Sequence, residues 1–237
     1  MKISIIGAGN VGSLTAMRLA QENLGSILLV DIIKGIAQGK SFDLDDARYI
    51  LKSNYKIEGT DDISKIKDSG IVIITAGLPR KPGMTREDLL QKNTAILKDV
   101  CAKIKSLARQ AIIIVVTNPL DIMTYFALKN TSFERNKVIG MGVSLDASRF
   151  ANLIANELNV PVDKIDAMVI GSHGEGMIPL ANFTTINNVP LSNFLGQEAI
   201  NSLIERTVLR GAEIVSLLGN SSAYFAPSAQ YFLLLRQ

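Results

Sequence analysis

The side chains in this sequence that could move a proton or hold an anion are one histidine, one aspartate and several arginines. His173 is the only histidine, and it lies in the stretch IGSHGEGMIPL with Gly171, Gly174 and Gly176 around it. Imidazole titrates near neutral pH and therefore suits general acid–base chemistry. The glycines indicate a specially shaped backbone that projects the imidazole, and an ordinary surface turn is the plainer interpretation of this stretch alone.

A second group of candidates lies on a predicted helix. Asp146 and Arg149, in the stretch LDASRF, are three positions apart and hence share one helical face. The planar guanidinium of arginine can form two parallel hydrogen bonds to a carboxylate. Arg149 is therefore a candidate for binding a substrate carboxylate, and a local surface ion pair with Asp146 is the alternative.

Further cations lie in a loop that contains several prolines. The stretch TAGLPRKPGMTREDLLQKN, at 75–93, follows an apolar run and contains Arg80, Lys81 and Arg86. Ligands of open parallel sheets bind beside the carboxyl ends of the strands. Proline stiffens such a loop and glycine offers a pivot, so it could close as a lid, although a solvated basic loop has the same residues. A histidine, an aspartate and several arginines are the groups needed to move a proton on an anionic substrate and to bind its charge.

The N-terminal stretch MKISIIGAGNVGSLTAMRLA has a glycine pattern typical of dinucleotide binding. Gly7, Gly9 and Gly12 lie between an apolar strand and an amphipathic helix. The glycines permit a tight turn, a close approach of the backbone to a diphosphate, and close packing of helix on strand. The unpaired N–H groups of the helix N-terminus then face the anion. A tight turn without a ligand is the alternative.

An acidic residue after the next strand indicates which cofactor binds. Asp31 ends the stretch SILLVD, about 20 residues beyond the glycines, where a carboxylate accepts hydrogen bonds from ribose hydroxyls. It would repel a 2′-phosphate, so we predict NAD rather than NADP. The stretch GIAQGKS, at 35–41, ends like a phosphate-binding P-loop, but Gly35 and Gly39 enclose three residues where that loop requires four. A nucleoside triphosphatase is therefore not indicated.

The alternation of apolar runs with amphipathic stretches predicts an α/β fold. The predicted strands are KISIIG from residue 2, SILLVD from 26, GIVIITAG from 70, AIIIVVTNP from 111 and KVIG from 137. Such near-continuous apolar strands favour a doubly wound parallel sheet of the Rossmann type, covered on both faces. From residue 144 a helix, short strands and a second helical pattern at 193–218 follow. We predict an NAD-binding domain at 1–143 and a smaller α+β substrate domain at 144–237.

The composition excludes several classes of protein. The 237 residues are 47% hydrophobic and 20% charged with a net charge of +3, and the basic residues are scattered rather than gathered as a nucleic-acid surface requires. No apolar run is long enough to span a membrane, and no signal peptide is visible. The lone Cys101 allows no intrachain disulfide. We expect a cytoplasmic protein that binds neither nucleic acid nor membrane.

On these residues the sequence resembles the malate dehydrogenases of the lactate-dehydrogenase-like type, in the lactate/malate dehydrogenase superfamily. The resemblance covers residues 1 to about 228, on the motifs IGAGNVG, TAGLPRKPGMTREDLLQKN, VTNPLD, LDASRF, GSHGEGMIPL and SAYFAPSA. It implies the reversible oxidation of malate to oxaloacetate with NAD. It also implies a small dicarboxylate substrate and a homodimer or homotetramer, with no metal ion.

The resemblance implies a role for each matched residue. His173 would be the proton acceptor and Asp146 its orienting partner. Arg149 would bind the carboxylate beside the reacting carbon, and Arg86 would close over the site and polarise the carbonyl. Arg80 would bind the second carboxylate, where lactate enzymes have glutamine. The remaining implied contacts are those of Asn118 with the substrate hydroxyl and the cofactor, and those of the cofactor with Gly7, Ala8, Gly9, Asn10, Val11, Gly12, Asp31, Asn93 and Val116.

Several positions depart from the family pattern. Glu175 replaces an aspartate that usually follows His-Gly, Leu209 and Arg210 stand where related sequences favour glycine, and Ser221 stands where a glycine is common. Family members continue beyond the C-terminal QYFLLLRQ, so the second domain is expected to be incomplete and its YFLLL run to lack cover. Two alternatives stay open. One is a lactate or other 2-hydroxy acid dehydrogenase, and the other is a catalytically impaired NAD-binding remnant.

Overall fold

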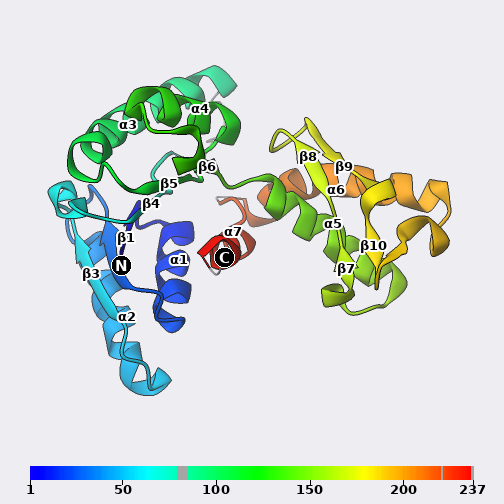
Figure 1. Cartoon of the computed structure of the whole chain (residues 1–237), viewed down its shortest axis with the longest axis horizontal. Coiled ribbons are helices and arrows are strands. Elements are labelled where there is room, and N and C mark those ends of the chain that lie inside the picture. The colour runs from blue at the N-terminus through cyan, green and yellow to red at the C-terminus, as the bar shows by residue number, and fades with distance from the viewer. Residues whose placement is uncertain (79–84, 220, 236–237) are drawn as a thin grey trace. The chain divides into compact units, whose positions relative to one another are not determined.

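The chain forms two compact units. The structure, a computed structural model, describes residues 1–78, 85–219 and 221–235, apart from the side chains of Arg86 and residues 231–235. The first unit comprises Met1–Met141 and Tyr224–Gln237, and the second comprises Gly142–Ala223 (Figure 1). The second unit is therefore inserted, in sequence, within the first.

A parallel sheet forms the centre of the first unit. Its strands are β1 (Lys2–Ile6), β2 (Ser26–Val30), β3 (Lys56–Thr60), β4 (Ile71–Ile74), β5 (Ile112–Val115) and β6 (Val138–Gly140). Every neighbouring pair runs parallel, in the order β3-β2-β1-β4-β5-β6. The direction of winding reverses between β1 and β4, which is where doubly wound sheets bind their ligands. The predicted fold class of this part is confirmed.

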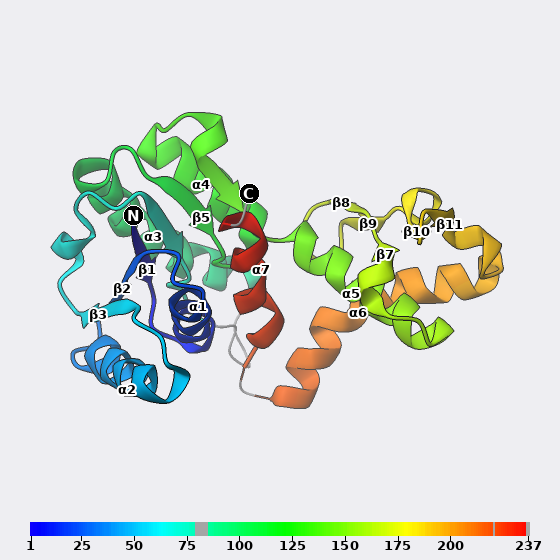
Figure 2. The same cartoon turned by 60° about the horizontal axis from the view of Figure 1, so that its bottom comes forward.

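Helices cover both faces of this sheet. They are α1 (Asn10–Gln21), α2 (Ile36–Leu51), α3 (Arg86–Leu107) and α4 (Leu120–Thr131), with short 3₁₀ turns η1 (Ile63–Ile66) and η2 (Arg135–Lys137). Figures 1 and 2 show α3 and α4 side by side on one face, and α1 and α2 on the other. Both faces are buried, since Ile5 and Ile6 are adjacent in β1 and at most 4% exposed. This burial explains why the central strands have few polar residues.

The edge strand β3 was not among the predicted strands. Its sequence KIEGT alternates exposed and half-buried residues, and only Thr60 is buried. An edge strand needs less apolar cover than a central strand, because one of its sides has no neighbouring strand. The pattern that identifies β1, β2, β4 and β5 is therefore absent from β3.

The helix α7 (Phe225–Leu235) belongs to the first unit. It lies beside α1 (Figure 2). Arg18 Nε of α1 donates a hydrogen bond of 3.2 Å to Ser228 Oγ of α7. The predicted second domain at 144–237 therefore differs from the second unit at its C-terminal end, because the contacts of α7 are with α1. The backbone of the apolar run YFLLL forms the last turns of this helix.

The second unit has two long helices and small antiparallel sheets. Its elements are α5 (Val143–Leu158), η3 (Val162–Lys164), β7 (Ile165–Asp166), β8 (Val169–Gly171), β9 (Met177–Pro179), η4 (Ala181–Phe183), β10 (Thr185–Ile186), β11 (Val189–Pro190), η5 (Leu191–Asn193) and α6 (Gln197–Leu218). β8 pairs with β9, and β10 lies between β11 and β7. Phe150 and Ile154 of α5 pack with Ile200 and Leu203 of α6 to form a separate apolar core. This arrangement is the predicted α+β type.

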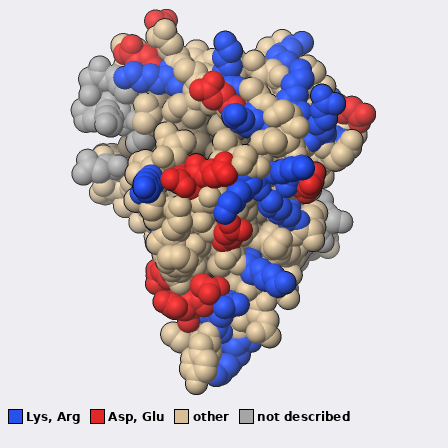
Figure 3. All heavy atoms as spheres, turned by 90° about the vertical axis from the view of Figure 1, so that its left-hand side faces the viewer, with Lys and Arg blue, Asp and Glu red and all other residues tan. Residues whose placement is uncertain are grey.

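Charged side chains of both signs lie on one face of the molecule (Figure 3). On the face shown in Figure 3, acidic and basic side chains lie interspersed rather than in one patch of a single sign. Such a surface is typical of a solvated face. Within the described part of the chain, none of the helices has the length and apolar character that crossing a bilayer requires.

Candidate active site

A buried aspartate and the single histidine meet in the second unit. Asp146 lies in the first turn of α5, and its side chain is fully buried. Its Oδ2 lies 2.8 Å from Nδ1 of His173, whose side chain keeps 18% of its exposure. When Nδ1 carries the proton, it donates a hydrogen bond to this carboxylate, and Nε2 is the nitrogen with the lone pair. The pair therefore provides an oriented imidazole.

The same carboxylate contacts Arg149, one turn further along α5. Asp146 Oδ1 accepts a hydrogen bond of 3.0 Å from Arg149 Nη1, and the arginine side chain is 11% exposed. Burial lowers the pKa of Arg149 from its ordinary value, while the carboxylate of Asp146 opposes this shift. Guanidinium stays protonated in such settings. The contact is thus a buried ion pair and not the surface pair that the sequence allowed as an alternative.

Two glycines shape the hairpin loop that contains His173. The loop joins β8 to β9, in which Gly171 pairs with Met177. Gly171 and Gly174 have φ values of 91° and 123°, a region that residues with a β-carbon rarely adopt. A β-carbon at Gly171 would also overlap the carbonyl oxygen of Gly176. The glycines therefore allow the tight turn from which His173 reaches Asp146.

The glycine loop of the first unit presents free backbone donors. Gly7 has a φ of 109°, and a β-carbon at Gly12 would overlap its carbonyl oxygen. A β-carbon at Gly9 would meet no atom within 4 Å, so the space in front of this residue is open. Among the described residues, no acceptor binds the backbone N–H of Gly9, Asn10 or Val11. N–H groups at the start of a helix bind anions such as a diphosphate.

Asp31 follows β2 directly and faces this loop. Its Oδ2 accepts a hydrogen bond of 2.7 Å from the N–H of Ala8, and its Oδ1 accepts one of 3.0 Å from the N–H of Ile33. The carboxylate is only half-buried. It lies at the carboxyl end of its strand, which is the position of a ribose-binding carboxylate in dinucleotide-binding sheets.

Two further residues hold the glycine loop and were not predicted. Thr75, after β4, donates a hydrogen bond of 2.9 Å to the carbonyl of Gly7. Lys40 Nζ donates to the carbonyl of Ala8 at 2.6 Å and to Ser13 Oγ at 2.9 Å. Lys40 belongs to the P-loop-like stretch at 35–41, which forms the start of α2 instead of a phosphate loop. A lysine in the second turn of the helix after Asp31 was the signal that could have identified it.

Asn93 joins the loops that follow β4 and β5. It is 1% exposed; its Oδ1 accepts from the N–H of Leu78 at 2.8 Å and its Nδ2 donates to the carbonyl of Asn118 at 2.8 Å. The amide of Asn93 is thus used by the backbone of both loops and orients them. Val116 continues the pairing of β5, because its N–H donates to the carbonyl of Ile74 at 2.9 Å.

Two predicted substrate-binding arginines lie wholly or partly outside the described residues. Arg80 lies outside the described residues, and Arg86 is the first residue of α3, with a side chain that also lies outside them. The start of α3 is fixed by a capping box. Thr85 Oγ1 accepts from the N–H of Asp88 and the Asp88 carboxylate accepts from the N–H of Thr85, each at 3.0 Å.

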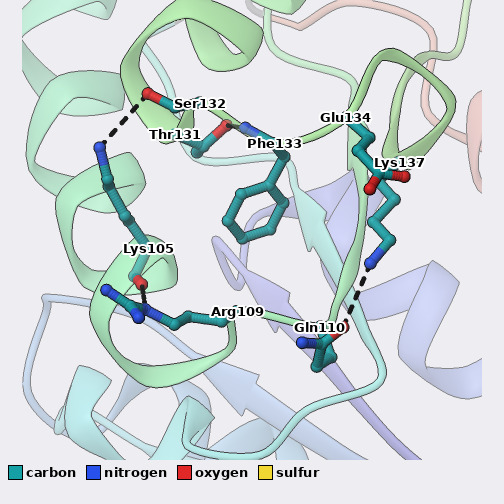
Figure 4. A pocket seen from close by; sticks show the side chains of 8 residues that line it. All are labelled: Lys105, Arg109, Gln110, Thr131, Ser132, Phe133, Glu134 and Lys137. Carbon is teal, nitrogen blue, oxygen red and sulfur yellow. Dashed lines mark hydrogen bonds between the residues drawn. The ribbon is translucent and has the colours of Figure 1, made fainter.

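A separate hollow in the first unit is lined by three cations (Figure 4). It has a volume of about 350 Å³ and is lined by Lys105, Arg109, Gln110, Thr131, Ser132, Phe133, Glu134 and Lys137. Arg109 Nε donates to the carbonyl of Lys105 at 3.2 Å, and Lys105 Nζ lies 3.3 Å from Ser132 Oγ. Both α3 and α4 end here, and helix C-termini carry partial negative charge. The cations offset that charge, so we assign the hollow no role in binding substrate or cofactor.

Comparison with known proteins gives a family for both parts of the chain. Residues 1–140 match the family model described as the NAD binding domain of lactate/malate dehydrogenase. Residues 143–232 match the model described as the alpha/beta C-terminal domain of lactate/malate dehydrogenase. Together the two matches cover nearly all of the sequence.

Individual relatives agree with these matches. The chain is 52% identical over 228 residues to the malate dehydrogenase of Methanosarcina acetivorans, which covers 96% of this chain and 74% of the relative. It superimposes on the apo malate dehydrogenase of Picrophilus torridus with a TM-score of 0.95 and 38% identity, covering 99% of this chain and 74% of that one. A third similar structure is the lactate dehydrogenase of Cryptosporidium parvum, complexed with lactic acid and nicotinamide adenine dinucleotide. Its TM-score is 0.94 at 37% sequence identity, and the match covers 98% of this chain and 75% of that one. The chain therefore spans about three quarters of the length of these relatives.

Proposed function

The chain belongs to the lactate/malate dehydrogenase family, and from this premise we propose that it is an NAD-dependent malate dehydrogenase. The reaction is the reversible oxidation of (S)-malate to oxaloacetate, in which the hydroxyl proton and the hydride on C2 are removed. The observation that carries the proposal is the buried carboxylate of Asp146, which contacts both His173 and Arg149. Asp146 thus positions a base, His173, beside an anion-binding group, Arg149. A small hydroxy acid needs both, because its hydroxyl loses a proton and its carboxylate carries a negative charge. The names of the relatives support malate as that acid.

The residues of the glycine loop fit NAD. The open space at Gly9 and the free N–H groups at the start of α1 suit a diphosphate. Asp31 would accept hydrogen bonds from the ribose hydroxyls, and its negative charge would disfavour the 2′-phosphate of NADP. When bound, NAD supplies the acceptor for the hydride. Ala8, Gly12, Asn93, Val116 and Asn118 complete the proposed cofactor-binding set.

The proton transfer is assigned to His173. In malate oxidation its Nε2 takes the proton of the substrate hydroxyl, and in the reverse direction the imidazolium returns a proton to the carbonyl oxygen of oxaloacetate. Asp146, bonded to Nδ1, keeps the ring in one orientation and stabilises the imidazolium. Because Asp146 is fully buried, its carboxylate needs no rearrangement of solvent when the ring becomes charged.

The two carboxylates of the substrate need two cations. Arg149 has nitrogen donors besides the Nη1 that contacts Asp146, and we assign it to the carboxylate next to C2. Arg80 is assigned to the distal carboxylate, because an unpaired charge in a closed pocket is costly. Arg86 is assigned to the carbonyl oxygen of the substrate, and Asn118 to the hydroxyl and the cofactor.

A lactate dehydrogenase is the alternative that one comparison favours, because a similar structure holds lactic acid. Lactate and pyruvate have a single carboxylate, for which a second cation at position 80 serves no purpose. Arg80 thus favours a dicarboxylate. An NAD-binding protein without turnover is the alternative from another class.

Initial rates of NADH oxidation by the 237-residue chain, with oxaloacetate and with pyruvate, test the proposal. We expect oxaloacetate to be the better substrate, and Arg80→Gln to lower its turnover and relatively favour pyruvate. A preference for pyruvate in the unaltered chain would identify a lactate dehydrogenase. Turnover of neither acid, with NADH binding retained in calorimetry, would identify a binding protein.

The proposal extends to assembly and location. On α2, Phe42, Tyr49 and Ile50 are 68%, 79% and 79% exposed. Large apolar side chains gathered on one helix favour burial against another copy, so we propose a homodimer or homotetramer. Light scattering of the purified chain measures this state.

We propose a cytoplasmic location, since the buried thiol of Cys101 suits a reducing compartment.

A further inference from the structure

We infer that Lys40 is a positioning residue for the diphosphate of the cofactor, acting through the carbonyl of Ala8. The inference rests on the proposed binding of NAD and assigns a role to a residue that neither the motif nor the comparisons single out. Lys40 lies in α2, while the glycine loop follows β1, so the contact joins two separate elements.

Ala8 is held at both of its backbone polar groups. Its N–H donates to Asp31 Oδ2 at 2.7 Å, and its carbonyl accepts from Lys40 Nζ at 2.6 Å. Lys40 also lies 2.9 Å from Ser13 Oγ, which itself lies 3.0 Å from the same carbonyl. The residue between the first two glycines of the motif is thus fixed by one anion and one cation.

The orientation of the next N–H follows from this contact. The carbonyl of Ala8 and the N–H of Gly9 belong to one planar peptide, and in a trans peptide they point in opposite directions. With the carbonyl directed at Lys40, the N–H of Gly9 is directed away from it. No acceptor among the described residues binds that N–H, and the space at Gly9 is open. Lys40, together with Ser13, therefore sets the direction of a donor that is free to bind a diphosphate oxygen.

The charge of Lys40 also strengthens that donor. A cation bound to a carbonyl oxygen draws electron density from the peptide, and hydrogen bonds in a chain polarise one another. A neutral side chain in its place would lose both effects. A lysine that merely tied α2 to the loop would instead affect stability, without distinguishing ligands that have a diphosphate from those that lack one.

Binding of three ligands to the full chain and to Lys40→Met tests the inference. NADH is titrated by its fluorescence, and ADP-ribose and adenosine are measured as competitors. We expect Lys40→Met to bind NADH and ADP-ribose about tenfold more weakly, as loss of an oriented, charge-assisted donor implies, and adenosine as before. Lys40→Arg should recover part of the affinity, because it keeps the cation. Lys98→Met removes an exposed lysine of α3 and is the matched control, with unchanged binding.

The outcomes separate this inference from the function on which it rests. If the unaltered chain does not bind NADH, the proposed function fails. If the unaltered chain binds NADH and Lys40→Met binds it equally well, only the role of Lys40 is overturned. Equal weakening of adenosine and ADP-ribose would also overturn it, since it would indicate a general disturbance. Lys40→Gln, which is neutral but still polar, takes the place of Lys40→Met if that variant does not fold.

Discussion

Asp146 Oδ2 lies 2.8 Å from His173 Nδ1, although the two residues are 27 positions apart and come from a helix and a hairpin. The other oxygen of the same carboxylate lies 3.0 Å from Arg149 Nη1. One buried side chain thus sets the positions of a proton-transferring group and of an anion-binding group. A small displacement of Asp146 would move both.

Replacing the histidine should separate binding from chemistry. His173→Asn keeps a polar side chain of similar size but cannot take a proton near neutral pH. We expect the turnover of oxaloacetate to fall by about a thousandfold, with NADH affinity unchanged, because general acid–base groups contribute at this level. Steady-state rates and a fluorescence titration measure the two quantities. Near-normal turnover would remove His173 from the mechanism.

Removing the buried carboxylate should destabilise the protein. In Asp146→Ala the guanidinium of Arg149, 11% exposed, loses its partner, and we expect the free energy of unfolding to fall by about 3 kcal/mol. Urea denaturation measures the change. Asp163→Ala is the matched control, because Asp163 is 69% exposed beside Lys164 and exposed pairs contribute under about 1 kcal/mol. Equal effects of the two variants would contradict the importance of burial.

The preference for NADH over NADPH should depend on Asp31. Asp31→Asn keeps an acceptor for the N–H of Ala8 but removes the charge that opposes a 2′-phosphate. We expect the kcat/KM with NADH, divided by that with NADPH, to fall about tenfold. Asp46→Asn, at an exposed position of α2, changes the net charge equally and should leave the ratio unaltered. An unaltered ratio in Asp31→Asn would show that another group excludes NADPH.

The single thiol should be inert while the protein is folded. Burial raises the pKa of Cys101 from 9.0 to about 12, so the reactive thiolate is nearly absent at neutral pH. We expect a thiol reagent to modify Cys101 only in denaturant, and modification of the folded chain at the rate of a free thiol would contradict its burial.

The same shift in pKa predicts a dependence of stability on pH. The folded state keeps a proton that the unfolded state loses above 9.0, so the contribution of the thiol is fully present below that pH and is lost as the pH rises toward about 12. We expect the free energy of unfolding to fall more steeply with pH in the unaltered chain than in Cys101→Ala. Parallel slopes would show that the thiol does not titrate differently on folding.

The central fold could be predicted because buried parallel strands leave a clear pattern. Runs such as SILLVD and AIIIVV are apolar on both faces, and the strands β2 and β5 lie within them. The edge strand β3 was not predicted, because four of its five residues are exposed or half-buried. The attachment of α7 to α1 was also not predicted, since nothing in a local pattern states which distant helix a segment will contact.

The candidate site likewise contains some contacts that could be predicted from the sequence and others that could not. The spacing of Asp146 and Arg149 on one helix predicted that they lie close together. The glycine pattern with Asp31 indicated a dinucleotide. The contact of Asp146 with His173 depends on the hairpin between β8 and β9, so it could be expected from a family resemblance but not from spacing. Lys40 was missed because its contact with Ala8 depends on how α2 lies beside the loop. The hydrogen bonds of the Asn93 side-chain amide to the backbone of Leu78 and Asn118 could not be predicted from residue type alone.

The hydrogen bond from Arg18 to Ser228 spans 210 positions of the chain. A ribosome releases the N-terminus first, so the flank of α1 that α7 covers must face water until those intervening positions have emerged. The segment Gly142–Ala223 is contiguous and has its own apolar core, so it can fold while synthesis continues. The packing of α7 on α1 therefore forms only after all of Gly142–Ala223 has been synthesised.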